Sequence, residues 1–524
     1  MRNKIRILIV ENEQDYRELE VDLVTAWGYE PVVATGKGDA LLQDAVKKAK
    51  TNRCQVALVD MRLRNNYDDT DISGLNIIQA LHPCRVIVVS GYGDQAVARK
   101  SIKEKGAESF VGKQEDPEVL QEELENVIAK FSAEKRGLRI SPESALEQVT
   151  DTLRIPEEFS EQAADIFALL FPKAQKLRLR QLGHEDASNF GTVPRPRSVV
   201  FEVRADELQP VLVKIARRHK IKIERDNYAA YIDNRLPGHK YPRIEKVDYL
   251  WDLGGATYTM LGGSGFQPFF RYYETAAISD INFTIAQFFE KTWGPLYADA
   301  RAPETTSLFQ LYNKVWGREW FDRICAFQMP SFPHTITPPD PVDWIKKFID
   351  PENDRSQTAG TQVAITHGDL HGDNLLIDDG RHAWFIDFER SGEGPILQDF
   401  VELESDLINR LPCSDDNFPV FLDLCLRVTR NQSLDSFDGL KNTPDAQIQK
   451  ILQTISTLRQ LACKCANTSD ARPYLIGLLF NTLFRATIVK DPAQRRALML
   501  ASILCHRIDH WDEPWPPENW QTMP

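Results

Sequence analysis

The sequence lacks long apolar runs and paired cysteines, and each absence excludes a class of protein. No uninterrupted apolar run approaches the roughly 18 residues that a membrane-spanning helix needs. The apolar stretch near the N-terminus ends at Glu11 and is too short for a signal peptide. The eight cysteines include no CxxC pair, so neither a cysteine metal motif nor a disulfide framework is indicated. We therefore expect a cytoplasmic protein without a membrane segment.

An excess of basic residues is also missing, since the net charge is −13. A general nucleic-acid-binding protein carries a basic surface, and no basic recognition helix is found, so nucleic acid is not an expected partner. Repeats and low-complexity tracts are absent as well. What is present is a chain of 524 residues, 42% hydrophobic and 27% charged. This composition is ordinary for a globular protein, and the length suits roughly two to four domains.

The first 130 residues alternate short apolar runs with helical patterns. The runs typical of buried strands lie at 5–10, 31–34, 55–59, 85–89 and 109–112. One intervening helix is expected over 13–27 and stops before Gly28. Strands that alternate with helices predict an α/β domain with a five-stranded, parallel, doubly wound sheet. In such a sheet, functional groups collect at the carboxyl ends of the strands.

Polar residues stand at those strand ends. They are Glu11, Asn12, Glu13, Asp60, Ser90 and Lys113. Acids, a hydroxyl and a lysine at one edge suit a magnesium-assisted acyl-phosphate site. A carboxylate attacks phosphorus, the metal offsets negative charge, and the lysine and serine hold the phosphoryl oxygens.

This pattern resembles the receiver domain of two-component response regulators, over about residues 4 to 130. The resemblance implies Asp60 as the phosphoacceptor, Ser90 as the switch hydroxyl and Lys113 as the phosphate-binding lysine. It implies a switch role for Phe110, with a simple core position as the equal alternative. The implied metal ligands are Glu11, Asn12 and Asp60. A histidine kinase is the implied phosphodonor, and the resemblance admits a homodimer formed through the receiver.

Two features depart from the receiver pattern. The family usually places two acids after the first strand, whereas this chain has Glu11 and Asn12. An amide oxygen can bind Mg²⁺ but brings no charge, so weaker metal binding is expected unless Glu11 or Glu13 compensates. The loop over 61–73 is also longer than usual. It carries Asp68, Asp69 and Asp71. These acids could add charge near the site, although a solvated loop is the favoured interpretation.

Residues 131–172 are expected to form a helical linker. Charged and turn-forming residues replace the apolar periodicity over 132–141, which reads as a linker. Two short amphipathic helices are predicted over 142–154 and 157–170. They could couple the flanking domains or form the edge of the next one, and simple packing is the favoured role.

The stretch around which the rest of the chain is organised is 366–389, THGDLHGDNLLIDDGRHAWFIDFE. It predicts a strand end, a polar loop, a short hairpin and a second strand. Asp369 and Asn374 stand five positions apart in the loop, and Asp387 ends the apolar run 383–386. A carboxylate that accepts a hydroxyl proton, an amide oxygen and a second carboxylate are what Mg-nucleotide phosphoryl transfer requires.

The loop over 367–374 resembles the catalytic loop of the aminoglycoside phosphotransferase and choline kinase-like families, which are distant relatives of the protein kinases. The resemblance implies Asp369 as catalytic base, with Asn374 and Asp387 as Mg²⁺ ligands and ATP or GTP as the nucleotide. The implied fold is an α+β, bilobal domain. Its N-lobe would span 173–265 and its C-lobe 266–524, with a helical C-terminal part. Asp399 either holds the loop against a helix, as in that family, or is an ordinary acid at a helix N-terminus.

The expected N-lobe contains Lys214 inside an apolar strand over 209–216. A buried lysine is costly unless it faces an anion. In kinase-like folds this lysine binds the α- and β-phosphates and pairs with a helical glutamate, for which Glu224 is the candidate. The alternatives are an edge-strand lysine and a solvated helix acid. A phosphate-covering loop is expected over 183–191, where glycine is scarce, and a hinge near 262–265.

Together, the two resemblances imply a signalling protein. Phosphorylation of Asp60 would regulate a phosphotransferase that acts on a hydroxyl acceptor. Fold-level analogy does not identify that acceptor. The alternative is a signalling adaptor with a catalytically silent, nucleotide-binding kinase fold. The scarcity of glycine over 183–191 favours the adaptor. The presence of four residues favours the enzyme: Asp369, Asn374, Asp387 and Lys214.

Overall fold

The computed structural model divides the chain into two compact units, which are described separately. The first comprises 1–181, 196–222 and 245–257, and the second 182–195, 223–244 and 258–524. The described residues are 5–65, 67–68, 71–91, 104–182, 198–206, 208–236, 241–259, 265–305, 307–329, 338–350, 353–357, 361–410, 418–440, 445–490 and 492–520. The predicted phosphate-covering loop, most of the predicted hinge, and Asp69 lie outside these residues.

The first unit begins with a parallel sheet. Its strands are β1 (Arg6–Val10), β2 (Glu30–Val33), β3 (Val56–Val59), β4 (Arg85–Ser90) and β5 (Ser109–Gly112). Their order is β2-β1-β3-β4-β5, and every pair is parallel. The predicted five-stranded parallel sheet is confirmed. Each strand carries apolar residues toward both faces, which is why both faces need helical cover.

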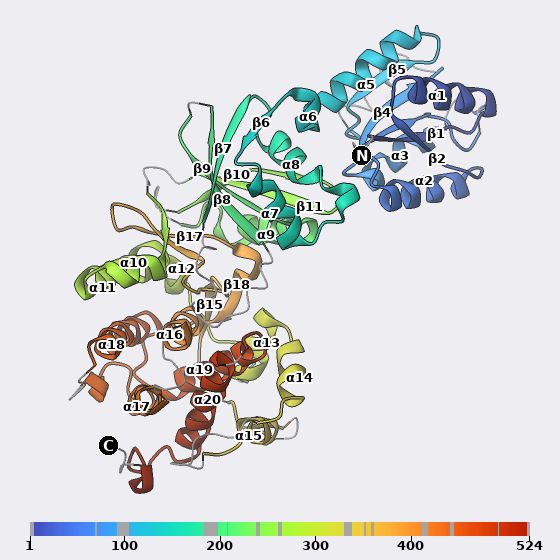
Figure 1. The fold of residues 1–524 in the computed structure, drawn as a ribbon. Helices are drawn as coiled ribbons and strands as arrows, with labels where there is room; N and C mark the ends of the chain where they lie inside the picture. The colour runs from blue at the N-terminus through green and yellow to red at the C-terminus, as the bar shows by residue number, and fades with distance from the viewer. Residues whose placement is uncertain are drawn as a thin grey trace. The chain divides into compact units, whose positions relative to one another are not determined.

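Helices cover both faces of this sheet (Figure 1). The helices α1 (Gln14–Ala26) and α5 (Pro117–Phe131) pack on one face, together with Ile7 and Ile9 of β1. The helices α2 (Asp39–Asn52) and α3 (Ser73–Leu81) pack on the other, together with Leu8 and Val10. The alternation of buried residues along β1 thus assigns each face its helices.

Residues 132–141, expected to be a linker, instead contain regular structure. They form helix α6 (Ala133–Arg136) and strand β6 (Arg139–Ser141), and β6 pairs in parallel with β7 (Lys176–Leu182). The Asp165 carboxylate accepts a hydrogen bond from the Ala133 backbone N–H at 2.9 Å. Because the partners of this segment lie more than 30 positions away in the chain, local periodicity could not reveal them. The predicted helices that follow are present as α7 (Ser144–Leu153) and α8 (Gln162–Leu170).

A second, six-stranded sheet follows. It contains β6, β7, β8 (Ser198–Ala205), β9 (Val211–Arg217), β10 (Arg243–Tyr249) and β11 (Leu253–Thr259), in the order β10-β11-β9-β8-β7-β6. One continuous hydrophobic cluster, the shared core, joins this sheet to the parallel one through α5, α7 and α8. It includes Ile9, Leu124, Phe167, Phe201 and Val213. The first unit is therefore held together by side-chain packing rather than by a flexible connection.

The second unit is mainly helical and has small sheets. Strand β15 (Val363–Thr366) pairs with β18 (Gly392–Pro395), and β16 (Leu375–Ile377) pairs with β17 (Ala383–Phe385), both antiparallel. The helices before them include α11 (Ile278–Ala286), α13 (Leu308–Trp316) and α15 (Pro341–Phe348). Those after them are α16 (Gln398–Arg410), α17 (Phe418–Val428), α18 (Ala446–Ala466), α19 (Arg472–Ala486) and α20 (Ala493–Asp509) (Figure 1). The predicted strand, loop, hairpin and later helices are all present.

Within the part of the chain that the structure describes, no helix combines the length and apolar character that crossing a bilayer would require.

Candidate functional site

The strand ends of the parallel sheet bring the predicted phosphorylation residues together. Glu11 follows β1, Asp60 follows β3 and Lys113 follows β5. The Lys113 ammonium lies 2.6 Å from Glu11 Oε2 and 3.3 Å from Asp60 Oδ2. The Met61 N–H donates to Asp60 Oδ1 at 2.8 Å, and the Ser90 hydroxyl also hydrogen-bonds this carboxylate. Four of the predicted residues therefore form one buried polar site.

The buried acids of this site suit a cation. Burial raises the pKa of Asp60, against the weaker effects of Lys113 and Ser90. Burial also raises the pKa of Glu11, and the charge of Asp60 adds to this shift. Carboxylate oxygens with an adjacent amide at Asn12 are ligands of the kind that Mg²⁺ prefers. A divalent ion would stabilise the ionised acids, so these residues fit the metal that the receiver resemblance implies.

Two predicted features near this site have further structural roles. Phe110 of β5 is partly buried and packs against the core under α2 and α3, a position compatible with either predicted role. Asp71 is not a solvated loop residue, because its Oδ2 accepts hydrogen bonds from Arg64 N at 2.8 Å and Asn65 N at 2.9 Å. Its other oxygen accepts from Ser73 N at 2.9 Å. Asp71 thus shapes the long loop from within.

Glu20 is an acid near this site that sequence reasoning missed. It lies on α1 and is only 6% exposed, and its Oε2 has no hydrogen-bond partner among the described residues. Burial raises its pKa to about 8, and the negative charge of Glu11 contributes. In the sequence, Glu20 looks like one of several solvated helix acids. Only its place on the buried face of α1 distinguishes it.

The second unit brings Asp369, Asn374 and Asp387 together as predicted. The loop after β15 carries Asp369, and the Asn374 amide donates from Nδ2 to the Asp369 carbonyl at 2.9 Å. The Ile386 N–H donates to the Asn374 carbonyl at 3.0 Å, which places Asp387 beside Asn374. Asp387 adopts a left-handed backbone conformation, with φ of 75°. A non-glycine residue in that region is usually held there by its surroundings, often at a functional site.

Arg390 is a partner of Asp369 that sequence reasoning also missed. Its Nη1 lies 3.0 Å from Asp369 Oδ1. Burial works to raise the pKa of Asp369, but the charge of Arg390 and, less strongly, that of His371 outweigh it. The pKa therefore lies below its usual value, and Asp369 is ionised at neutral pH. Its side chain is 32% exposed, so a substrate could reach it.

The loop rests on three buried acids of α16, here called the acidic face: Asp399, Glu402 and Asp406. Asp399 accepts hydrogen bonds from His367 N at 2.9 Å and Gly368 N at 3.0 Å. Glu402 accepts from Leu370 N at 2.6 Å. Asp406 accepts from Gly372 N at 2.7 Å. Helical geometry aligns these three positions on one side of α16, so the helix acts as a template for the loop.

Asp399 therefore combines both predicted roles, since it lies in the first turn of α16 and holds the loop. Two alternatives for the expected N-lobe residues prove wrong. Glu224 is not a solvated acid, because it is 1% exposed and accepts from Phe388 N at 3.1 Å and from the Tyr258 hydroxyl. Lys214 is 2% exposed, and its strand β9 lies between β11 and β8 rather than at an edge. The predicted pairing of Lys214 with Glu224 joins residues of different units and stays a prediction.

The predicted magnesium ligands of the loop also fit the ion. Because Asn374 donates through Nδ2, the ligand atom that it would offer to Mg²⁺ is Oδ1, and Asp387 would offer its carboxylate. No group of three or more His, Cys, Asp or Glu side chains among the described residues could hold a metal ion. A site with one carboxylate and one amide matches Mg²⁺, which is commonly completed by water and substrate phosphates.

Two segments of the chain match known families. Residues 7–125 match the response regulator receiver domain, and residues 331–483 match the ternary complex associated domain 9. No curated protein sequence matches the chain.

Solved structures similar to the chain include several receivers. Chemotaxis protein CheY4 of Vibrio cholerae is 20% identical, over 24% of this chain and 98% of its own, with a TM-score of 0.20. The receiver domain of NtrX from Brucella abortus is 24% identical, over 23% of this chain and 97% of its own, with a TM-score of 0.20. A receiver domain of a sensor histidine kinase from Pseudomonas aeruginosa PAO1 holds magnesium in its active-site cleft. It is 20% identical, over 24% of this chain and 98% of its own, with a TM-score of 0.20. With the family match and the five-stranded parallel sheet, residues 7–125 are identified as a response regulator receiver domain.

Proposed function

We propose that this protein is a signalling phosphotransferase whose receiver domain regulates it. A histidine kinase phosphorylates Asp60, and the second half of the chain transfers the γ-phosphoryl group of ATP or GTP to a hydroxyl. The observation that carries the enzyme proposal is the hydrogen-bonded loop that sets Asp369, Asn374 and Asp387 side by side. The receiver match supports the signalling half.

In this proposal, Asp369 orients the acceptor hydroxyl and takes its proton as the oxygen attacks the γ-phosphorus. The bond between that phosphorus and the β–γ bridging oxygen breaks, and the nucleoside diphosphate leaves. Its low pKa makes it a weak base, so most of its effect is orientation, with proton transfer late in the step. Asn374 Oδ1 and the Asp387 carboxylate would hold Mg²⁺, which offsets charge on the phosphates. The acidic face of α16 keeps the loop in the geometry that this chemistry needs.

In the receiver, the Asp60 carboxylate attacks the phosphorus of phosphohistidine, and the bond between phosphorus and the histidine nitrogen breaks. Glu11, Asn12 and Asp60 would hold Mg²⁺ for this step. The Lys113 ammonium, which is now paired with both Glu11 and Asp60, would move to bind the oxygens of the added phosphoryl group. Loss of its contact with Glu11 would then be the first local consequence of phosphorylation.

The test is nucleotide turnover by the full chain with Mg²⁺, with and without acetyl phosphate as a donor for Asp60. Wild-type turnover should vanish in both Asp369→Asn and Asp387→Ala, while Asp369→Asn still binds nucleotide. Asp423→Asn, an exposed acid of α17, is the matched control and should retain turnover. Equal turnover in Asp369→Asn and wild type would refute the assignment of Asp369.

The alternative is a nucleotide-binding adaptor without catalysis. The Arg390–Asp369 ion pair favours it, because a paired carboxylate is less available to an acceptor. Nucleotide binding with no turnover across a panel of small-molecule and protein hydroxyl acceptors would favour this adaptor.

A further inference from the structure

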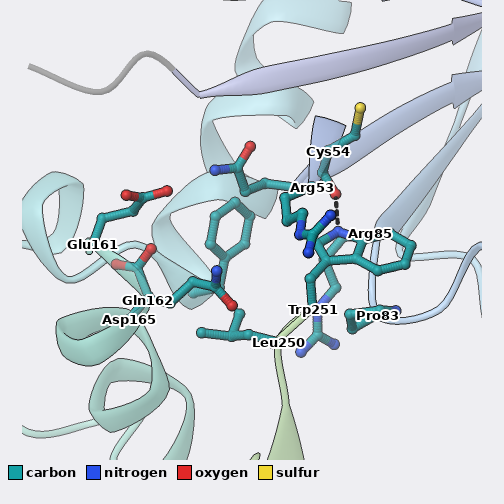
Figure 2. Close-up of a pocket in the computed structure, with 11 residues that line it drawn as sticks. Arg53, Cys54, Pro83, Arg85, Glu161, Gln162, Asp165, Leu250 and Trp251 are labelled. Carbon is teal, nitrogen blue, oxygen red and sulfur yellow. Dashed lines mark hydrogen bonds between the residues drawn. The ribbon is translucent and has the colours of Figure 1, made fainter. Parts of the chain in front are cut away.

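The turn between β10 and β11 is fastened to the receiver at the edge of the sheet opposite to Asp60. The Trp251 indole N–H donates to the Cys54 carbonyl at 2.7 Å (dashed line in Figure 2). The Arg53 guanidinium bonds both oxygens of Asp252, from Nε at 3.2 Å and from Nη2 at 3.1 Å. Arg53 and Cys54 stand one residue before β3, the strand after which Asp60 stands. Four strand residues thus separate this contact from the phosphoacceptor edge.

Further contacts make this junction specific. Arg85 at the start of β4 donates to Asp248 of β10 at 3.2 Å. The Asp252 backbone N–H donates to the Gln162 side chain of α8 at 3.0 Å, and Gln162 donates back to the Asp252 carboxylate at 3.0 Å. Bidentate arginine–carboxylate geometry resists sliding better than a single contact does. Displacement of β3 or β4 would therefore move the turn with it.

A small pocket lies within this junction, lined by receiver residues, α8 and the turn (Figure 2). Its volume of about 20 Å³ has room for a water molecule but not for an organic effector. The junction is therefore a packed contact and not a ligand site.

The turn leads directly to the expected nucleotide-binding lysine. Strand β11 starts at Leu253, immediately after Asp252, and its neighbour in the sheet is β9, which carries Lys214. Leu250, Leu253 and Val213 belong to the same shared core as Val56 and Ile87 of the receiver strands. Close-packed protein cores transmit displacement instead of absorbing it.

Arg53 itself is held rigidly. It adopts a left-handed conformation, with φ of 51°, at the end of α2, and its N–H donates to the Ala49 carbonyl. Its guanidinium also donates to the Lys50 carbonyl at 2.9 Å and stacks over the ring of Phe159. A side chain fixed at so many points has little freedom to adjust when its partner moves.

We infer that the β10–β11 turn, residues 250–252, is the element through which the receiver passes its phosphorylation state to β9 and Lys214. The inference rests on the proposed function only in that Asp60 accepts a phosphoryl group. It needs no turnover by the second half of the chain.

Hydrogen–deuterium exchange of the full chain tests it, with Mg²⁺ and beryllofluoride as the probe that mimics an aspartyl phosphate. In wild type, exchange of the receiver strands and of residues 211–217 and 249–257 should change together. The exchange rates should change by about fivefold or more, since fivefold is the lower end of the usual range of allosteric coupling between two sites. Arg53→Met combined with Trp251→Phe should keep the receiver response and lose the response of the other two segments. Arg180→Met, which removes an ion pair with Glu202 in the same unit, should behave as wild type.

Each contrary outcome has its own meaning. A receiver that responds while residues 249–257 do not would overturn the inference and leave receiver phosphorylation intact. An unchanged response of β9 in the double variant would also overturn it. No response in the receiver strands would mean that Asp60 does not accept the analogue, and the inference would then fail together with that half of the proposed function. Trp251→Phe alone keeps an aromatic ring and removes only the indole N–H, so it serves as the test if the double variant does not fold. It should weaken the exchange response at residues 249–257.

Discussion

At the scale of single residues, Asp369 owes its ionised state to Arg390. Without that guanidinium, burial would dominate and raise the pKa of Asp369. In Arg390→Met, we therefore expect the acidic limb of the pH profile of kcat/KM in the proposed reaction to move to higher pH. The sign follows because the ionised carboxylate is the active form in the proposed reaction, so the proposed activity falls as pH drops through its pKa. A lower kcat at every pH with an unmoved limb would contradict this positioning role.

Glu20 predicts a pH dependence of stability. Its pKa is about 8 in the folded protein and 4.5 for the ordinary side chain. Since the folded value is raised, stability is full below pH 4.5 and is lost as pH rises toward 8. The loss amounts to as much as about 5 kcal/mol. Glu20→Gln should therefore exceed wild type in stability at pH 8 and match it near pH 4.

Denaturant unfolding of wild type and Glu20→Gln at pH 4, 6 and 8 measures this effect. Glu18→Gln, an exposed neighbour on the same helix, is the control and should follow wild type throughout. A constant difference between Glu20→Gln and wild type at the three pH values would show that folding does not raise the pKa of Glu20.

Residues at strand ends could be predicted from the sequence, whereas Glu20 and Arg390 could not. Asp60 and Lys113 each follow an apolar run, and a parallel sheet brings such positions to one edge. Glu20 stands in a helix rich in charge, where burial depends on which face meets the sheet. Arg390 and Asp369 are 21 positions apart in the sequence, and no local sequence pattern predicts an ion pair over that separation.

At the scale of elements, α16 is the clearest case of buried charge with a structural purpose. Asp406 accepts from Arg485 at 2.6 Å and from Gly372 at 2.7 Å, and it pairs with Arg410 at 3.0 Å. Removing one partner leaves buried cations uncompensated, which costs about 3–5 kcal/mol. Asp406→Ala should therefore lower the free energy of unfolding by that amount.

Urea unfolding compares Asp406→Ala with Asp423→Ala, which breaks a partly exposed i,i+4 pair with Arg427 on α17. The control should cost less than about 1 kcal/mol. Similar losses for both variants would mean that the acidic face is more hydrated than its burial indicates.

The elements themselves followed the sequence closely where periodicity was strong. The hairpin β16–β17 lies within the stretch 366–389 that predicted it, and helices α17 to α20 make up the expected helical C-terminal part. The short strand β6 was missed because it has three residues and derives its stability from β7. The acidic face of α16 was missed because charged side chains usually mark a solvated side. Here the backbone N–H groups of the loop make burial of those acids favourable.

At the scale of the whole molecule, the shared core makes the receiver and the six-stranded sheet one cooperative body. Native-state hydrogen exchange should give β6, α8 and β1 similar opening free energies, because all three depend on the same packing. A linker would instead exchange with little protection. If the opening free energy of residues 139–170 were lower than that of β1 by about 2 kcal/mol or more, the core would not be cooperative.

Exchange of sensory modules between proteins is commonly planned by cutting where a recognised domain ends. In this protein, a cut after residue 130 would separate Phe131 from the rest of α5 and would leave α5 without α8, so that its apolar side is uncovered. It would also discard the carboxylate that receives Arg53. A hybrid that still carries a signal would need the foreign receiver to present an arginine before its third strand and an apolar last turn on α5. A receiver can therefore be exchanged only if its surface matches the surface of the sheet and helices that follow it. Whether a candidate receiver has the required residues can be checked in its sequence before any chimera is built.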